Sequence, residues 1–285
     1  MSGDSRRLLG EGLRGAGYLA DDGLLTAIHL ARSLRLPLLI EGEPGVGKTE
    51  VARALAQVLH RELIRLQCYE GLDAAQALYE WDYPRQLLQL RSGDVGSRAD
   101  ELFSDRFLLQ RPLLAALRAE AGAVLLIDEI DRADSEFEAF LLEFLGDFQI
   151  TIPEIGTVTT ATPPLVVLTS NRTRELHDAL KRRCLYHWIP YPDAQREREI
   201  IRIKAPGVDE SAAERLVRAV NSVRDLGPMK RPGIAEAIAW ARGVQVLGEE
   251  GVDWFEALRQ SLGLLVKSEE DVRLVEAHRE DVFAP

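Results

Sequence analysis

The chain has 285 residues, of which 46% are hydrophobic and 28% charged, and its formal net charge is −11. This composition is typical of a soluble globular protein, and the length favours one large domain plus a smaller one. The acidic balance has the wrong sign for a protein whose main task is gripping nucleic-acid phosphates. We expect no membrane span, since no apolar run approaches ~20 residues. The N-terminus lacks a signal-peptide core, and two distant cysteines suit a reducing cytoplasm.

Residues 42–49 read Gly-Glu-Pro-Gly-Val-Gly-Lys-Thr, between the apolar run 36–40 and a segment with helical periodicity. The pattern G-x-x-x-x-G-K-[ST] between a strand and a helix is typical of a phosphate-binding loop. Its glycines allow successive N–H groups to point at a phosphate, and the helix adds the positive end of its dipole. We therefore expect a nucleoside triphosphate to be bound by Gly42, Glu43, Pro44, Gly45, Val46, Gly47, Lys48 and Thr49.

Within this loop two side chains have distinct expected tasks. Lys48 would reach the β- and γ-phosphates, and the Thr49 hydroxyl would coordinate Mg²⁺. A second part of the site follows the apolar run 123–127, which is typical of a parallel strand buried on both faces. Asp128 ends that strand and would hold Mg²⁺ through water, whereas Glu129 is placed to polarise a water for attack on the γ-phosphate.

The Asp-Glu pair also narrows the class of nucleotide-binding protein. A small-molecule kinase transfers phosphate to a bound acceptor and needs no water-activating glutamate here. A GTP-binding switch needs an Asn-Lys-x-Asp motif, and neither Asn171 nor Asn221 begins one. The sequence therefore favours ATP hydrolysis.

Two later segments complete the expected site. The apolar run 165–169 predicts another buried strand, followed by Asn171, whose neutral amide can position the attacking water. Residues 176–184 predict a short helix with a basic end at Lys181, Arg182 and Arg183, although basic residues at that end of a helix commonly just complement its dipole.

The chain resembles the AAA+ ATPases, and within them the MoxR branch, in the order of four motifs. These are the phosphate loop, the Asp-Glu strand, the Ser-Asn strand end and the Arg-Arg-Cys helix. Two insertions support this branch. One lies at about residues 71–111 and carries a polar stretch from Arg91 to Asp100, and the other is a β-hairpin at about 149–160 around a Pro/Gly turn. Residues 17–21 and 181–184 most resemble the accessory ATPase of carbon monoxide dehydrogenase maturation.

This resemblance implies roles for further residues. Asn171 matches sensor 1, and Arg231 matches sensor 2, with Pro232 in the first turn of the following helix. Arg183 best matches the arginine finger that reaches the ATP of a neighbouring subunit, with Arg182 as its competitor. Tyr18 lies where the family contacts adenine. A homo-oligomeric ring, hexameric in most relatives, is implied as well.

The alternation of strand and helix patterns predicts an α/β fold with a parallel AAA+ P-loop sheet. We expect a nucleotide-binding core at residues 1–190 and a smaller, all-helical lid at 191–285, with helical patterns at 194–203, 210–223, 234–245, 254–265 and 269–280. A helix at 136–145 presents one apolar stripe to the core, and Ser135 with Glu138 forms a plausible capping box at its start.

Three hypotheses for the function stay open, the third of which is a small-molecule kinase that would transfer phosphate to a metabolite. The first is a Mg²⁺-dependent, oligomeric ATPase that remodels a protein client during metalloenzyme maturation, with a von Willebrand-factor-A protein as adaptor; the client and the adaptor come from the resemblance alone. The second is a nucleic-acid motor or loader, against which the acidic charge and the absence of any Lys/Arg-rich run argue. The stripe of Tyr79, Trp81 and Tyr83 could grip a client or pack within the insert.

Overall fold

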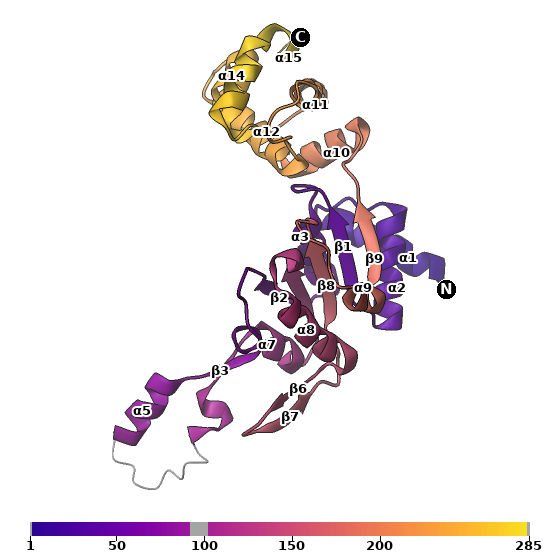
Figure 1. Cartoon of the computed structure of the whole chain (residues 1–285). Helices are drawn as coiled ribbons and strands as arrows, with labels where there is room; N and C mark the ends of the chain where they lie inside the picture. The colour runs from indigo at the N-terminus through magenta and orange to yellow at the C-terminus, as the bar shows by residue number, and fades with distance from the viewer. Residues whose placement is uncertain (1, 92–101, 284–285) are drawn as a thin grey trace. The chain divides into compact units, whose positions relative to one another are not determined.

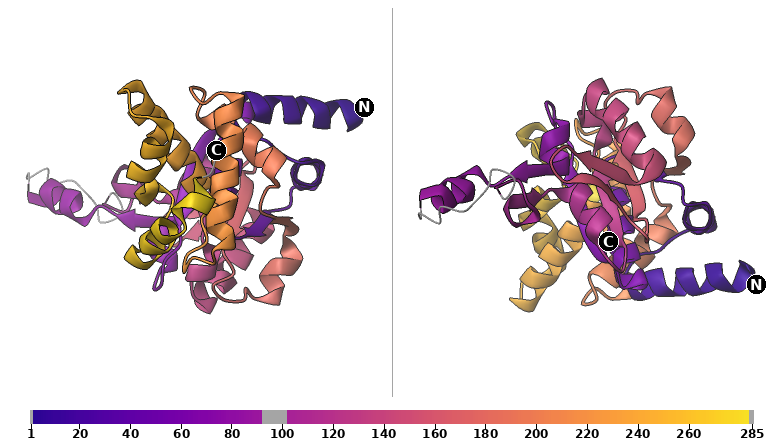
Figure 2. Two further views of the ribbon diagram at one scale, coloured as in Figure 1. Left: turned by 90° about the horizontal axis from the view of Figure 1, so that it is seen from above. Right: turned by 90° about the horizontal axis from the view of Figure 1, so that it is seen from below.

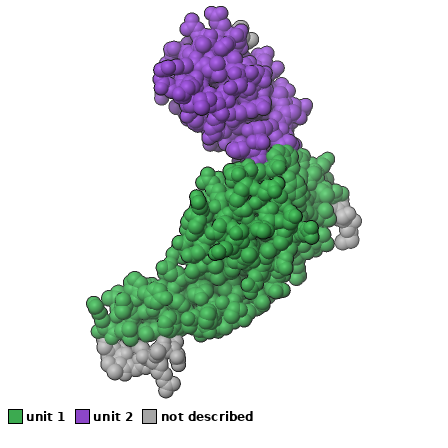
Figure 3. All heavy atoms as spheres, in the orientation of Figure 1, with its two compact units in different colours: residues 1–16, 20–41, 49–188 green, residues 17–19, 42–48, 189–285 purple. Residues whose placement is uncertain are grey.

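The computed structural model describes residues 2–91 and 102–283, and its chain divides into two compact units (Figure 3). The first unit comprises residues 1–16, 20–41 and 49–188, and the second comprises residues 17–19, 42–48 and 189–285. The second unit thus contains most of the phosphate loop. Positions 92–100 of the polar stretch expected in the insert lie outside the described residues.

A five-stranded parallel sheet in the order β2-β5-β8-β1-β9 confirms the predicted α/β class (Figure 1). The interior strands β5 and β8 are buried along their whole length, as the continuous apolar runs indicated. The strands are β1 (Leu38–Gly42), β2 (Glu62–Gln67), β5 (Ala123–Asp128), β8 (Leu165–Ser170) and β9 (Leu185–Ile189).

Two short antiparallel ribbons accompany the sheet. The pair β6 (Gln149–Ile152) and β7 (Gly156–Thr159) confirms the predicted hairpin. The other pair is β3 (Tyr79–Trp81) and β4 (Leu108–Gln110), and it carries the insert away from the sheet, as all views show (Figures 1 and 2). Trp81 is buried and makes an edge contact with Phe103, at 5.2 Å between ring centroids, so packing within the insert accounts for this member of the aromatic stripe.

Helices complete both units. Those of the first unit are α1 (Ser2–Gly15), α2 (Asp22–Leu34), α3 (Lys48–Leu59), α4 (Ala74–Leu78), α5 (Tyr83–Arg91), α7 (Pro112–Arg118), α8 (Ser135–Asp147) and α9 (Asp178–Arg183), with 3₁₀ turns at Asp105–Phe107 and Ile130–Arg132. Those of the second unit are α10 (Ala194–Lys204), α11 (Glu210–Asp225), α12 (Ile234–Glu249), α13 (Trp254–Gln260), α14 (Glu269–Ala277) and α15 (Arg279–Val282), with a 3₁₀ turn at Leu262–Leu264.

The last two helical patterns were expected to be continuous, and this was wrong. The helix expected at 254–265 ends at Gln260, where the Ser261 hydroxyl donates to the Ala257 carbonyl at 2.6 Å and a 3₁₀ turn follows. A side chain that bonds the backbone locally competes with helix continuation, and Gly263 weakens it further. The helix expected at 269–280 is likewise interrupted at His278.

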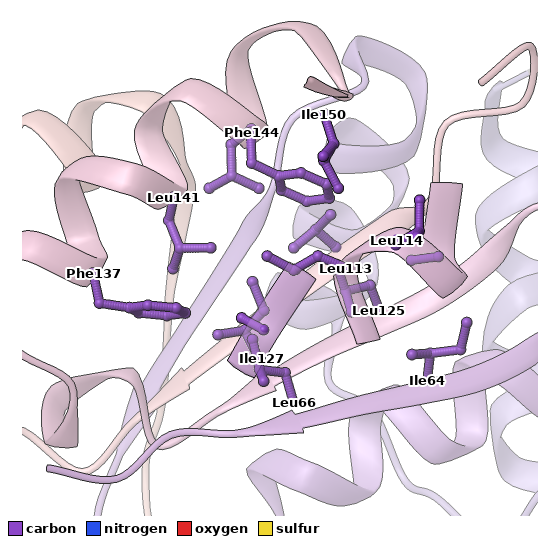
Figure 4. Packing of buried hydrophobic residues seen from close by; sticks show 14 of the residues in the cluster. Ile64, Leu66, Leu113, Leu114, Leu125, Ile127, Phe137, Leu141, Phe144 and Ile150 are labelled. Atoms are coloured by element: carbon purple, nitrogen blue, oxygen red, sulfur yellow. The ribbon is translucent and has the colours of Figure 1, made fainter. Parts of the chain in front are cut away.

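The core of the first unit holds the sheet against α7 and α8 (Figure 4). Side chains from α8, such as Leu141 and Phe144, face strand residues such as Leu125 and Ile127, and all four are buried. Burial of this size stabilises each large side chain by about 1.5–3 kcal/mol. The predicted apolar stripe of α8 is therefore core.

The predicted cap of α8 was wrong by one residue. Asp134, rather than Ser135, is the N-cap, and its carboxylate accepts the N–H of Phe137 at 2.9 Å. Glu138 does not reach back to the helix start, because its fully buried carboxylate pairs with Arg174 and accepts the N–H of His177 at 2.8 Å. Glu138 thus ties α8 to the segment that leads into α9.

Candidate functional site

The phosphate loop joins the end of β1 to the start of α3, as the sequence predicts. Its glycines are required by the backbone: a Cβ at Gly42 would lie 2.5 Å from the carbonyl oxygen of Ile189, and Gly45 and Gly47 have φ of +79° and +93°. Lys48 is buried, and its ammonium donates to the carbonyls of Gly42 at 2.7 Å and Glu43 at 2.8 Å. The loop therefore encloses the Lys48 ammonium, which is bonded to the backbone carbonyls of the loop itself.

Other residues of the second unit line this loop. A ring carbon of Tyr18 would lie 3.8 Å from a Cβ at Gly47, so the structure brings Tyr18 to the phosphate loop. The N-terminus of α12 contacts the loop as well, because the N–H of Ala235 donates to the Gly45 carbonyl at 3.3 Å. Gly233 is the N-cap of α12, so the expectation that Pro232 lies in the first helical turn was wrong by two positions.

Arg231 is exposed just before α12, in the unit that holds the phosphate loop. Its guanidinium lies 5.7 Å from the ring centroid of Tyr191, and that of Arg224 lies 5.8 Å from the same centroid. Burial and the neighbouring carboxylate of Glu43 raise the pKa of Tyr191, although both arginines oppose the shift. Tyr191 therefore keeps its hydroxyl proton at neutral pH, and its neutral ring contacts two cations.

Buried ion pairing positions this segment, although no pattern in the sequence predicts the pair. Arg224 on α11 makes a two-pronged pair with Glu197 on α10, at 2.8 Å for each bond, and both side chains are almost fully buried. The same guanidinium donates to the Pro232 carbonyl at 2.9 Å. Losing one partner of such a pair is strongly destabilising, because it leaves an uncompensated buried charge. The pair thus fixes the backbone beside Arg231.

In the first unit, the structure brings together the two residues expected to bind Mg²⁺. The Thr49 hydroxyl donates to one carboxylate oxygen of Asp128 at 3.0 Å, and the Thr169 hydroxyl donates to the same oxygen at 2.5 Å. Asp128 is 2% exposed. Hydroxyl and carboxylate oxygens fit Mg²⁺, which takes one or two protein carboxylates and completes its shell with substrate phosphates and water. The described residues contain no group of three or more His, Cys, Asp or Glu able to hold a metal.

Glu129 follows in a backbone conformation that few non-glycine residues adopt. Its φ is 55°, in the left-handed region, and its N–H donates to the Thr169 hydroxyl at 2.9 Å. The carboxylate is about one-third exposed and lies 3.1 Å from both Gln67 Nε2 and Arg132 Nε. Such strained residues cluster at functional sites. In this backbone conformation the adjacent side chains of Asp128 and Glu129 differ in exposure: Asp128 is buried, and Glu129 reaches solvent.

The end of β8 is held by Asp131, which is buried. Its carboxylate accepts the N–H of Asn171 at 3.2 Å and both the N–H and the hydroxyl of Thr173, at 2.8 and 2.7 Å. These bonds fix the backbone at Asn171, whose side-chain amide makes no hydrogen bond to the part of the chain that the structure describes. Asp131 is a positioning residue that was not predicted from the sequence, although it belongs to the same run of acids as Asp128.

Arg182 and Arg183 are both exposed at the end of α9. Arg183 Nη1 donates to the Leu142 carbonyl of α8 at 2.5 Å, and both arginines line an open hollow together with Arg35. The structure thus presents them on the surface of the first unit and brings neither to Asp128 by any described contact.

Cys68 adjoins the acidic strand end but has no chemical task there. Burial, reinforced by the charges of Asp128, Asp131 and Glu129, raises the pKa of its thiol to about 12. The thiol therefore stays protonated and acts as a small apolar side chain.

Comparison with known proteins bears on the family. The chain matches the AAA domain (dynein-related subfamily) over residues 37–184. It is 25% identical over 216 residues to Protein NorQ of Paracoccus denitrificans, covering 73% of this chain and 72% of NorQ. It is also 25% identical over 234 residues to the Denitrification regulatory protein NirQ of Pseudomonas aeruginosa, covering 80% of this chain and 82% of NirQ.

Solved structures agree on the fold. A variant of Thermotoga maritima RuvB superimposes with a TM-score of 0.52 at 21% identity, covering 90% of this chain and 75% of RuvB. A likeness at this identity shows the fold alone. No helix in residues 2–91 and 102–283 combines the length and apolar character needed to cross a bilayer. Because the matched family domain spans more than half of the sequence, the chain belongs to the AAA family in its dynein-related subfamily, and the prediction of an AAA+ ATPase of MoxR type is confirmed.

Proposed function

We propose that this ATPase is Mg²⁺-dependent, assembles into a homo-oligomeric ring, and remodels a protein client in the cytoplasm. The observation that carries the metal dependence is the contact of the Thr49 hydroxyl with the buried Asp128 carboxylate at 3.0 Å. A bound Mg²⁺ would neutralise charge on the β- and γ-phosphates.

The protein groups divide the work as follows. Lys48 and the loop N–H groups bind the phosphates, Thr49 and Asp128 hold Mg²⁺, and Tyr18 contacts the base. Glu129 accepts a proton from the attacking water, since it is the acid of the pair that reaches solvent, and Asn171 orients that water. Arg231 binds phosphate oxygens from the lid, for which we propose residues 191–285.

Oligomerisation is proposed from the exposure of the basic end of α9. Arg183 contacts α8 through the Leu142 carbonyl, and neither Arg183 nor Arg182 forms an ion pair among the described residues. An arginine that stabilises transition-state charge in trans requires a head-to-tail contact, and such a contact closes into a ring if its rotation closes. Six members is the number we propose, with Arg183 as the finger.

For the client we propose a metalloenzyme under maturation, such as a carbon monoxide dehydrogenase-like enzyme, with a von Willebrand-factor-A protein as adaptor. The resemblance within the MoxR branch supports this, and the name of one relative, Denitrification regulatory protein NirQ, links that relative to denitrification. No observation favours the nucleic-acid motor, because the net charge is −11 and the likeness to RuvB extends only to the fold.

The test is ATPase activity of the purified chain against Mg²⁺ and protein concentration. We expect turnover to need Mg²⁺, to rise per subunit with protein concentration, and to be insensitive to DNA. Activity that is independent of Mg²⁺, or stimulated by DNA in a salt-dependent manner, would overturn the proposal.

A further inference from the structure

The buried carboxylate of Asp128 forms an ion pair with Arg65, which lies on the neighbouring strand β2. Arg65 of β2 donates to Asp128 Oδ2 through Nε at 3.0 Å and through Nη2 at 2.5 Å. The parallel register pairs Gln67 with Asp128, which places Arg65 two residues earlier on the same face of the sheet. The contact therefore follows from strand pairing.

The other oxygen of the same carboxylate is occupied as well, since Thr49 and Thr169 both donate to Oδ1. A metal ion ligated through Asp128, directly or through water, must therefore approach a carboxylate that already neutralises a guanidinium. Two cations on one buried carboxylate repel each other strongly, because the surroundings screen charge less than water does. The two cations must compete.

The two partners differ in their freedom to move. The Asp128 side chain is 3% exposed, whereas that of Arg65 is 46% exposed. Arg65 can therefore turn its guanidinium into solvent, where a charge is well hydrated, while Asp128 cannot leave its place. Competition at this site is resolved by movement of the arginine.

We propose that Arg65 is a built-in counter-cation that holds Asp128 when the site has no metal and yields it to Mg²⁺ when Mg²⁺–nucleotide binds. Its attraction to Asp128 sets the affinity of the site for the metal. The inference rests on the proposed Mg²⁺ dependence. It differs from a fixed structural ion pair, in which Arg65 stays on Asp128 in every state.

The first experiment measures metal binding directly. Mn²⁺ is the probe, because its free ion gives an electron paramagnetic resonance signal that disappears on binding, and ADP is present at saturation. We expect Arg65→Gln to bind Mn²⁺ at least about threefold more tightly than the wild type, and Mg²⁺ to displace it. The matched control is Arg53→Gln, which removes an exposed arginine of α3 that faces Glu50; it should leave the affinity unchanged. Unchanged or weaker Mn²⁺ binding in Arg65→Gln would overturn the proposal.

The second experiment separates a yielding cation from a fixed one. In the absence of metal, Arg65→Gln should melt at a lower temperature than the wild type, because buried Asp128 has lost its counter-ion. Saturating Mg²⁺ and ADP should remove this difference. A difference that persists at saturation means that Arg65 stays in place, and the proposal is wrong. If Arg65→Gln does not fold, Arg65→Lys replaces it, because lysine keeps the charge but cannot make the two-pronged bond. Arg65→Lys should bind Mn²⁺ more tightly than the wild type, by less than the threefold expected for Arg65→Gln.

The same two experiments distinguish a failure of the proposed Mg²⁺ dependence from a failure of the proposed role of Arg65. If the wild type itself takes up no Mn²⁺ with ADP and gains no thermal stability from Mg²⁺–ADP, the proposed metal dependence fails for every variant. If the wild type responds and Arg65→Gln matches it, only the role of Arg65 fails.

Discussion

Asp128 and Arg183 both belong to the first unit, yet their surroundings are opposite. Asp128 is almost completely buried, and Thr49, Thr169 and Arg65 hold both of its carboxylate oxygens. Arg183 is exposed and held by the carbonyl of Leu142, in a hollow open to solvent. A group that acts within its own chain can be fixed in advance by buried bonds. A group that acts on a neighbour must be presented at the surface and find its partner only on assembly.

The largest effect is expected at the phosphate loop, because neither the buried Asp128 nor the exposed Arg183 can act when no nucleotide is bound. Lys48→Ala should abolish nucleotide binding or turnover, because it removes the buried cation from the β- and γ-phosphates. Binding of a fluorescent ATP analogue and phosphate release are the measurements. Lys267→Ala, which removes an exposed lysine of the same unit that bonds the Gly263 and Leu264 carbonyls, is the matched control. Wild-type ATPase activity in Lys48→Ala would contradict the assignment of the nucleotide site.

The exposed side of the comparison is probed by Arg183→Ala. This variant should bind ATP nearly as the wild type does and hydrolyse it on the order of 10³-fold more slowly, as expected for the loss of an arginine finger. Single-turnover hydrolysis and equilibrium ATP binding separate the two effects. Arg182→Ala should lose much less. If the order is reversed, Arg182 is the finger; if neither changes the rate, the surface arginines have no catalytic role.

The buried side is probed by the two adjacent acids. Glu129→Gln should retain ATP binding and slow hydrolysis by about 10²-fold or more, because a general base is lost. Asp128→Asn should instead weaken the Mg²⁺-dependent part of binding, because its oxygens are the ones placed with Thr49. Trapped ATP is counted after rapid gel filtration. Equal loss of ATP affinity in both variants, with no trapping in either, would contradict this division of roles.

The smallest effect concerns the helix under Arg183. Asp134→Ala should lower the free energy of unfolding by about 1 kcal/mol, because Asp134 caps α8 through the N–H of Phe137. Ser135→Ala should change it by much less. Urea unfolding followed by circular dichroism measures both. Equal losses in the two variants would restore Ser135 as the cap.

The nucleotide-binding motifs and the sheet could be predicted from sequence because their signals are local. A glycine pattern fixes the loop between β1 and α3, where Gly45 and Gly47 indeed have positive φ, and continuous apolar runs mark β5 and β8 as buried strands. Each signal lies within a few residues of the feature that it predicts.

The contacts across strands and between helices could not be predicted in this way. Arg65 meets Asp128 only because β2 pairs with β5 in one register, and nothing within β2 encodes that partner. The pair of Arg224 with Glu197 joins residues 27 positions apart on two helices. The cap at Asp134 was missed for a different reason: Asp and Ser are both good N-caps, and pattern alone does not choose between neighbours.

The central claim is that each ATP site needs a buried set from one chain and an exposed arginine from the next, and mixing two inactive variants tests it most directly. Lys48→Ala lacks a working phosphate loop but keeps Arg183, whereas Arg183→Ala keeps the loop and lacks the finger. Combined in verified mixed rings, they should recover part of the ATPase activity, because some interfaces pair an intact loop with an intact finger. Absence of any recovery in such rings, or full activity of the wild type as a monomer at high dilution, would contradict the account.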